Sequence, residues 1–442
     1  MATTQASPLV YAELLLNIRQ VSVIATFGIP CSATTQAGLS GDGKQFLLRH
    51  DGRTTILNLP GEVALQVLPS PTAGSLEYSW RLPLAGTYNP PDVSHAQSNE
   101  SPWAATTLSQ ESEFSCLRCG NVIIQGGHIQ SWRDLPSENW AEMMDFWHCH
   151  KPSVHAHQHP MGSQGNEDVQ DHPDLTTSKG YGASTKFSAR DGVAFVDITS
   201  FLVSESNVVG AKPSSASAFE KFKHEQQEFP ISELDSLKCN NCNSTLGYND
   251  IQSEGYKIWK WNLVRKDKPT PTPRSWVGTV SIPTIVSSLI SSVIASQGCS
   301  KLTLIPRISG AGGTTKADHP EKSRSATSHQ SRSDSLNLWV LSSVLRYSSS
   351  RQMQENSHIG QCSLPAQLAG TPAMKIFWKN VSLETAKALA DRLEVEEIYL
   401  PLDAFESVRQ ALTDSSSLLP ENGRKFRGWE VGLLDRYELL DT

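Results

Sequence analysis

The sequence has no long uninterrupted apolar run. Its most membrane-like stretch, residues 282–295, is interrupted by four serines and is too short to cross a bilayer. The N-terminal segment also lacks the basic start and apolar core of a secretory signal. We therefore expect an intracellular protein without a membrane partner, in which residues 282–295 form a half-buried helix.

Clustered positive charge is scarce as well. The formal net charge is −7, and basic residues occur only in short patches such as Arg424, Lys425 and Arg427. Nucleic-acid binding usually needs a continuous basic face. The sequence therefore predicts no direct nucleic-acid partner, and the mild acidity indicates ordinary solubility.

Apolar residues are few for a chain of this length. They make up 38% of the 442 residues, which is low for a fully packed protein. Ser, Thr, Pro and Gly fill the deficit and are concentrated in a few segments. We predict flexible insertions at 151–185 and 204–226, and a disordered linker at 308–334.

The rest of the chain predicts a β-rich α+β fold. Alternating runs on either side of the turn at 49–52 indicate antiparallel strands near the N-terminus. After residue 335, strand-like and helix-like stretches alternate, which is typical of a small α+β unit. The predicted parts are an antiparallel β-rich N-terminal unit at 8–90, a central zinc-knuckle β domain at 111–265, and an α+β C-terminal unit made of 275–306 and 335–442.

Two Cys-x-x-Cys motifs give the strongest chemical signal. Cys116 and Cys119 form the first motif, and Cys239 and Cys242 form the second. A two-residue spacer lets two thiolates on one turn reach the same ion, and four thiolates make the tetrahedral set typical of structural zinc. The alternatives are two unrelated surface pairs or a redox-active pair. We predict a zinc site that joins distant segments, so that losing the ion should unfold the central domain.

A further cysteine lies between two histidines. Cys149 is flanked by His148 and His150, at the end of a segment in which aromatic residues and methionines have helical spacing. A neighbouring histidine favours the thiolate, so Cys149 and His150 are our candidate catalytic pair. Alternatively, Cys149 or His150 belongs to the zinc site, or Cys149 is a buried structural cysteine. The residues alone leave these three interpretations open.

Five short motifs follow one another in a distinctive order. They are Cys-Leu-Arg-Cys-Gly at 116–120, Leu-Pro-Ser-Glu-Asn-Trp at 135–140, Trp-His-Cys-His at 147–150, Cys-Asn-Asn-Cys at 239–242 and Tyr-Lys-Ile-Trp-Lys-Trp at 256–261. This order resembles that of the HECT-like ubiquitin ligases that bind ubiquitin-conjugating enzymes (E2). The resemblance covers residues 114–261 and extends more loosely over both flanks.

The resemblance implies a ubiquitin-protein ligase that accepts ubiquitin from an E2 and passes it to a protein substrate, through a cysteine thioester. It also implies a tie to the pre-mRNA 3′-end cleavage machinery, in which the chain would be a non-catalytic, zinc-stabilised protein-binding factor. The implied partners are an E2, ubiquitin, a protein substrate and a pre-mRNA cleavage factor. The C-terminal part departs from a HECT lobe, because Cys362 lies in a poorly matching context. Cys149 is therefore our first candidate for the thioester and Cys362 the second.

Overall fold

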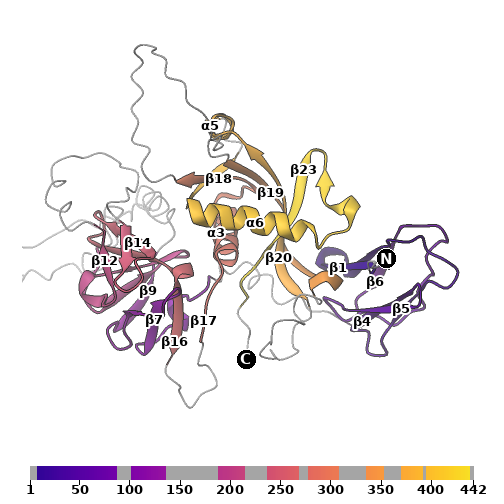
Figure 1. Ribbon diagram of the computed structural model, residues 1–442, viewed down its shortest axis with the longest axis horizontal. Coiled ribbons are helices and arrows are strands. Elements are labelled where there is room, and N and C mark those ends of the chain that lie inside the picture. The colour runs from indigo at the N-terminus through magenta and orange to yellow at the C-terminus, as the bar shows by residue number, and fades with distance from the viewer. Residues whose placement is uncertain are drawn as a thin grey trace, which may run out of the picture. The chain divides into compact units, whose positions relative to one another are not determined.

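The chain forms two units in the computed structural model, which describes residues 7–86, 101–135, 188–214, 236–267, 277–307, 335–352, 370–391 and 395–438 (Figure 1). Unit 1 comprises Met1–Pro102, Ser217–Leu234 and Thr279–Thr442, and unit 2 comprises Trp103–Ala216 and Asp235–Gly278. Both units consist mainly of β-strands, and the described α-helices lie in unit 1. The β-rich α+β class predicted from the sequence is thus confirmed.

The largest sheet of unit 1 combines both ends of the chain. Strand β1 (Leu9–Leu15) pairs antiparallel with β2 (Gln20–Thr26) on one side and with β19 (Ser335–Ser349) on the other. Beyond β2 lies β6 (Glu77–Pro83). The strands beyond β19 are β20 (Thr371–Val381), β23 (Trp429–Asp435) and β22 (Lys425–Phe426) on one path, and β18 (Lys301–Arg307) and β21 (Glu396–Pro401) on the other.

Strand β1 is buried on both faces, which explains its nearly continuous apolar sequence. Val10 and Ala12 point into one core, together with residues of β2 and β6. Tyr11 points into a second core on the opposite face, where its ring stacks on that of Tyr347 at 6.1 Å between centroids. Because side chains alternate along a strand, this one strand contributes to two cores.

A three-stranded sheet packs on the first of these cores. Its strands are β3 (Gln36–Leu39), β4 (Gln45–His50) and β5 (Arg53–Asn58). The predicted hairpin turn is confirmed, since Asp51 and Gly52 join β4 to β5 with φ angles of 48° and 72°. Phe46 of β4 lies against Trp80 of β6, with 5.0 Å between ring centroids, and so connects the small sheet to the large one.

Three described helices accompany the large sheet: α3 (Ile282–Gln297), α5 (Leu383–Asp391) and α6 (Leu402–Ser416). The Ser281 hydroxyl caps α3 by accepting a hydrogen bond from the Thr284 N–H, and Gly298 ends the helix in a left-handed conformation. Helix α3 packs against α6 and β23, and its residues Ile285, Val286 and Ile290 are fully buried. The half-buried helix predicted at 282–295 is therefore confirmed. Among the described residues, no helix is both long enough and apolar enough to cross a membrane.

Unit 2 contains two sheets. The first follows the order β12 (Ala211–Pro213), β13 (Ser236–Cys239), β14 (Thr245–Asp250), β15 (Gly255–Trp259), β11 (Ser200–Val203), β10 (Val193–Val196) and β9 (Ser131–Asp134). The second follows the order β17 (Val277–Gly278), β16 (Leu263–Asp267), β7 (Ser112–Cys116) and β8 (Val122–Ile124). A short turn at Lys260–Asn262 carries the chain directly from β15 in the first sheet to β16 in the second.

Aromatic side chains fill the core of unit 2. The Phe114 and Phe201 rings lie 4.8 Å apart, and Trp132 contacts both. Trp103, which is 4% exposed, also packs on these two phenylalanines. This core holds together residues from both sheets of unit 2.

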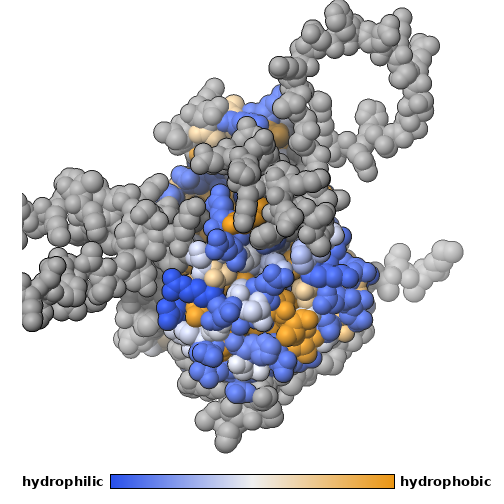
Figure 2. Space-filling view, turned by 90° about the vertical axis from the view of Figure 1, so that its left-hand side faces the viewer, coloured by the Kyte–Doolittle hydropathy of each residue, from blue (hydrophilic) through white to orange (hydrophobic). Residues whose placement is uncertain are grey.

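The coloured part of the surface in Figure 2 is mostly hydrophilic, with apolar residues in separate areas. In unit 2 the large exposed apolar side chains are Leu117, Val209 and Ile251, among the residues that the structure describes. Single exposed apolar residues are ordinary on a protein surface. They do not by themselves mark a docking site.

Candidate metal centre

The two Cys-x-x-Cys motifs occupy two hairpin turns in unit 2. The first knuckle, residues 116–121, joins β7 to β8, and the second knuckle, residues 239–244, joins β13 to β14. In each knuckle the residue after the second cysteine has a positive φ, 72° at Gly120 and 57° at Asn243. Gly and Asn tolerate this left-handed conformation better than other residues. The turns therefore form where the sequence supplies these residue types.

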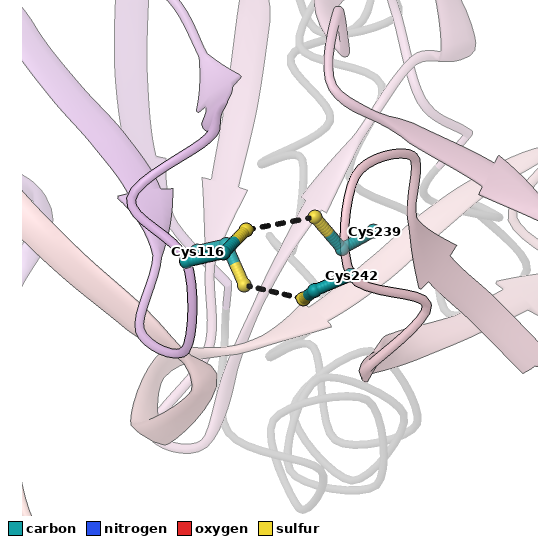
Figure 3. A group of neighbouring side chains, drawn as sticks. Cys116, Cys239 and Cys242 are labelled. Carbon is teal, nitrogen blue, oxygen red and sulfur yellow. Dashed lines mark hydrogen bonds between the residues drawn. The ribbon is translucent and has the colours of Figure 1, made fainter.

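The four cysteine sulfurs lie close together, although they come from two different sheets (Figure 3). All four Sγ atoms lie within 4.8 Å of one another. The Sγ atoms of Cys116 and Cys242 are 3.7 Å apart, and those of Cys119 and Cys239 are 3.6 Å apart. Around an ion with metal–sulfur distances of ~2.3 Å, the corners of a sulfur tetrahedron are ~3.8 Å apart. The four cysteines can therefore hold one metal ion.

These separations do not suit disulfides. The two close pairs are much farther apart than the ~2.05 Å of a sulfur–sulfur bond, and all four cysteines are free. Four thiolates this close would repel one another strongly in the absence of a cation. The donor set thus fits a soft or borderline metal better than any arrangement of the cysteines alone.

The protein surrounds the four thiols unequally. Cys116 and Cys239 are buried, whereas Cys119 and Cys242 are partly exposed. Hydrogen bonds from the Ser244 hydroxyl, and then from its backbone N–H, lower the pKa of Cys242 to about 6. The Asn121 backbone N–H and the Asn241 side chain likewise lower the pKa of Cys119. Burial raises the pKa of Cys239 to about 11. The protein itself therefore favours the thiolate form of Cys242 and Cys119, and a cation would favour deprotonation of the whole set.

The structure does not describe the remaining candidates from the sequence. Cys149 and His150, the predicted catalytic pair, and Cys362 all lie outside the described residues. Sequence reasoning did not single out Ser244 and Asn121, whose side chains touch the cysteine sulfurs. A signal was available, because each is a polar residue two positions after the second cysteine of its motif.

Lys260 is a second buried polar feature of unit 2. Its side chain is 0% exposed, and the ammonium group lies 5.4 Å from the centroid of the Phe201 ring. Burial lowers its pKa to about 7, although the carboxylates of Asp197 and Asp134 act in the opposite direction. The carbonyl of Thr199 accepts its backbone N–H. Lys260 thus belongs to the core where β15 passes into the second sheet.

Comparison with known proteins gives one family and several relatives. The family model described as HECT-like ubiquitin-conjugating enzyme (E2)-binding matches residues 13–431. An uncharacterized protein of Saccharomyces cerevisiae is 24% identical over 333 residues, which is 74% of this chain and 71% of that protein. An uncharacterized protein of Schizosaccharomyces pombe is 38% identical over 64 residues, or 14% of this chain and 18% of that protein.

A relative with a described activity is an E3 ubiquitin-protein ligase of Rattus norvegicus. It is 28% identical over 171 residues, which is 36% of this chain and 42% of the ligase. No solved structure matches the chain.

Proposed function

This chain belongs to the HECT-like family of proteins that bind ubiquitin-conjugating enzymes, and from this premise we propose that it binds an E2 and transfers ubiquitin to a protein substrate. The observation that carries the proposal is the length of the family match, which spans residues 13–431 and so includes both units. The similarity to a rat E3 ubiquitin-protein ligase supports the same activity.

The four clustered cysteines take a structural part in this proposal. Zinc would be held by Cys116, Cys119, Cys239 and Cys242, because four thiolates with these separations suit its tetrahedral preference. When bound, the ion would cross-link the hairpins of two sheets and would supply no open position for chemistry. A site of four metal-binding thiolates would need a reducing compartment, so we place the protein inside the cell.

Transfer would proceed through Cys149. His150 would take the thiol proton, and the resulting thiolate would attack the carbonyl carbon of the E2–ubiquitin thioester. The new thioester forms as the E2 cysteine leaves as a thiolate, so that bonds and charge balance. A substrate amine would then displace Cys149 in the same way. Cys362 is the second candidate for this role.

The experiment mixes the purified chain with a panel of E2 proteins, a ubiquitin-activating enzyme, ATP and ubiquitin. We expect stable binding of at least one E2, and a chain–ubiquitin adduct that a thiol reagent removes. Cys149→Ser should abolish the adduct or convert it into a thiol-resistant ester, whereas Cys299→Ser should leave it unchanged. An unchanged thiol-sensitive adduct in Cys149→Ser would show that Cys149 does not form the thioester. A lack of binding to every E2 would overturn the proposal.

A second candidate is a non-catalytic binding factor, as the described cysteines outside the cluster offer no nucleophile. Outside the cluster, the described cysteines are Cys31 and Cys299. Cys31 is buried, and burial raises its pKa, which is unsuitable for a nucleophile. The Cys299 thiol donates a hydrogen bond to the Lys301 carbonyl. A stoichiometric complex with an E2 or with a pre-mRNA cleavage factor, formed without any adduct, would support this candidate.

Metal analysis tests the zinc assignment separately. Protein purified in reducing buffer without chelator should contain about one zinc ion per chain, since four thiolates complete one site. Two ions per chain would bring Cys149 and His150 into consideration as ligands. A zinc content of zero would exclude the assignment.

A further inference from the structure

The two knuckles repeat one another in detail. In the first, the Gly120 N–H donates to the Cys116 carbonyl and the Cys116 N–H donates to the Asn121 carbonyl. In the second, the Asn243 N–H donates to the Cys239 carbonyl and the Cys239 N–H donates to the Ser244 carbonyl. Asn121 and Ser244 are therefore equivalent positions, each two residues after the second cysteine of its knuckle.

These two equivalent residues reach across to the opposite knuckle. The Ser244 hydroxyl lies 3.4 Å from the Sγ atom of Cys116, the first cysteine of the first knuckle. The Asn121 side-chain amide donates toward the Sγ atom of Cys239, the first cysteine of the second knuckle, at 3.7 Å. The contacts are thus reciprocal, although one residue is a serine and the other an asparagine.

The sulfurs that receive these contacts are the two that water cannot reach. Cys116 is 1% exposed and Cys239 is 0% exposed, whereas the other two cysteines are partly exposed. Four thiolates around a divalent cation carry a net charge of about −2, which needs hydrogen-bond donors where solvent is excluded. The Asn121 amide supplies such a donor to Cys239, and the Ser244 hydroxyl lies within reach of Cys116 as well as of Cys242.

We propose that Ser244 and Asn121 are a reciprocal pair of positioning residues, each of which holds the buried thiolate of the opposite knuckle in place for the metal. This inference rests on the proposed zinc site and adds two residues to it. The pair also links the two hairpins directly, so each knuckle orients a ligand of the other.

Each residue makes one further contact that does not follow the symmetry. Ser244 also lies 3.0 Å from the Sγ atom of Cys242 in its own knuckle. A hydroxyl has one hydrogen, so Ser244 donates to only one of the two thiolates at a time. Asn121 also donates to the Gly210 carbonyl at 3.1 Å, which ties the first knuckle to the segment before β12. The loss of Asn121 therefore affects backbone packing as well as the sulfur contact.

The test uses the full chain with Ser244→Ala, with Asn121→Ala, and with Asn249→Ala as the control. Asn249 lies in β14 of the same unit and is partly buried. The rate of zinc transfer to a chromophoric chelator should rise about tenfold in each of the first two variants, and the control should match the wild type. Ser244→Thr retains the hydroxyl and should restore slow release.

Cobalt-substituted protein separates positioning from general destabilisation. Hydrogen bonds lower the energy of sulfur electrons, so their loss should move the sulfur-to-cobalt charge-transfer band to longer wavelength in Ser244→Ala and Asn121→Ala. A purely structural defect would weaken binding without this shift. If Asn121→Ala does not fold, Asn121→Asp keeps the shape of the side chain but removes the amide N–H donor. The charge-transfer band should then move in the same direction.

The outcomes distinguish failure of the reciprocal pair from failure of the proposed zinc site. Wild-type protein that binds metal, with variants that match it in release rate and in spectrum, would overturn the reciprocal pair and leave the zinc site standing. Wild-type protein that binds neither zinc nor cobalt would overturn both.

Discussion

Among individual residues, Lys260 has an unusual environment for a lysine, because its side chain is fully buried in the core of unit 2. Its pKa of about 7 in the folded chain is far below the ordinary value of 10.5. The unfolded chain would therefore bind a proton between pH 7 and pH 10 that the folded chain has released. Stability should rise with pH across this window.

We predict that Lys260→Met removes this pH dependence. In the wild type, the free energy of unfolding should gain up to about 1.4 kcal/mol per pH unit above pH 7 from this one group. Urea unfolding of both proteins at pH 7, 8 and 9 provides the measurement, and other titrating groups cancel in the comparison. Parallel pH profiles for the two proteins would contradict the assignment.

The cysteines give a second prediction at the scale of the residue. Cys239→Ser should lose the bound metal, because serine is a poor zinc ligand and Cys239 is one of the four proposed donors. The metal content and the thermal unfolding temperature should both fall. Cys299→Ser is the matched control, since Cys299 lies outside the cluster and should keep both values. Full metal content in Cys239→Ser would remove this cysteine from the ligand set.

The capped helix α3 provides a prediction at the scale of the element. Ser281 accepts a hydrogen bond from the Thr284 N–H at the start of the helix. Ser281→Ala should therefore lower the free energy of unfolding by about 1 kcal/mol. Ser296→Ala changes an exposed serine in the last turn of the same helix and should have a much smaller effect. Denaturant unfolding, followed with a probe in unit 1, measures the free energy of unfolding of both variants. Equal losses of stability in the two variants would argue against the cap.

Local sequence predicted several elements well, because short-range chemistry decides them. The turn at Asp51 and Gly52 follows from turn-forming residues, and the helix predicted at 282–295 is present as α3. The two knuckles also follow from local spacing. The pair of motifs also predicted that the two knuckles meet. By contrast, no local pattern indicated that each knuckle would lie at the end of a different sheet, since residues far apart in the chain must first fold into those sheets.

At the scale of the whole molecule, the division into two units leads to a prediction about chelation. The candidate metal centre lies entirely within unit 2. Removing the ion should therefore increase amide hydrogen exchange in β7, β8, β13 and β14, while β1 and β19 in unit 1 stay protected. Exchange measured with and without a zinc chelator tests this. A uniform increase across both units would show that the chain unfolds as one body.

The sequence by itself determined the chemistry available to this protein: four thiols in two Cys-x-x-Cys turns, the β-rich class, and motifs that place it in its family. These depend on residue type and on spacing over a few positions, which are visible without a structure. The tertiary structure decided which distant segments meet. It paired β1 with β19 across more than three hundred residues of sequence, brought the two knuckles within 4.8 Å, and set Ser244 and Asn121 beside the buried sulfurs. The motifs had predicted that the knuckles meet. The pairing of β1 with β19 and the positions of Ser244 and Asn121 depend on the packing of complete sheets, so no local pattern along the chain encodes them.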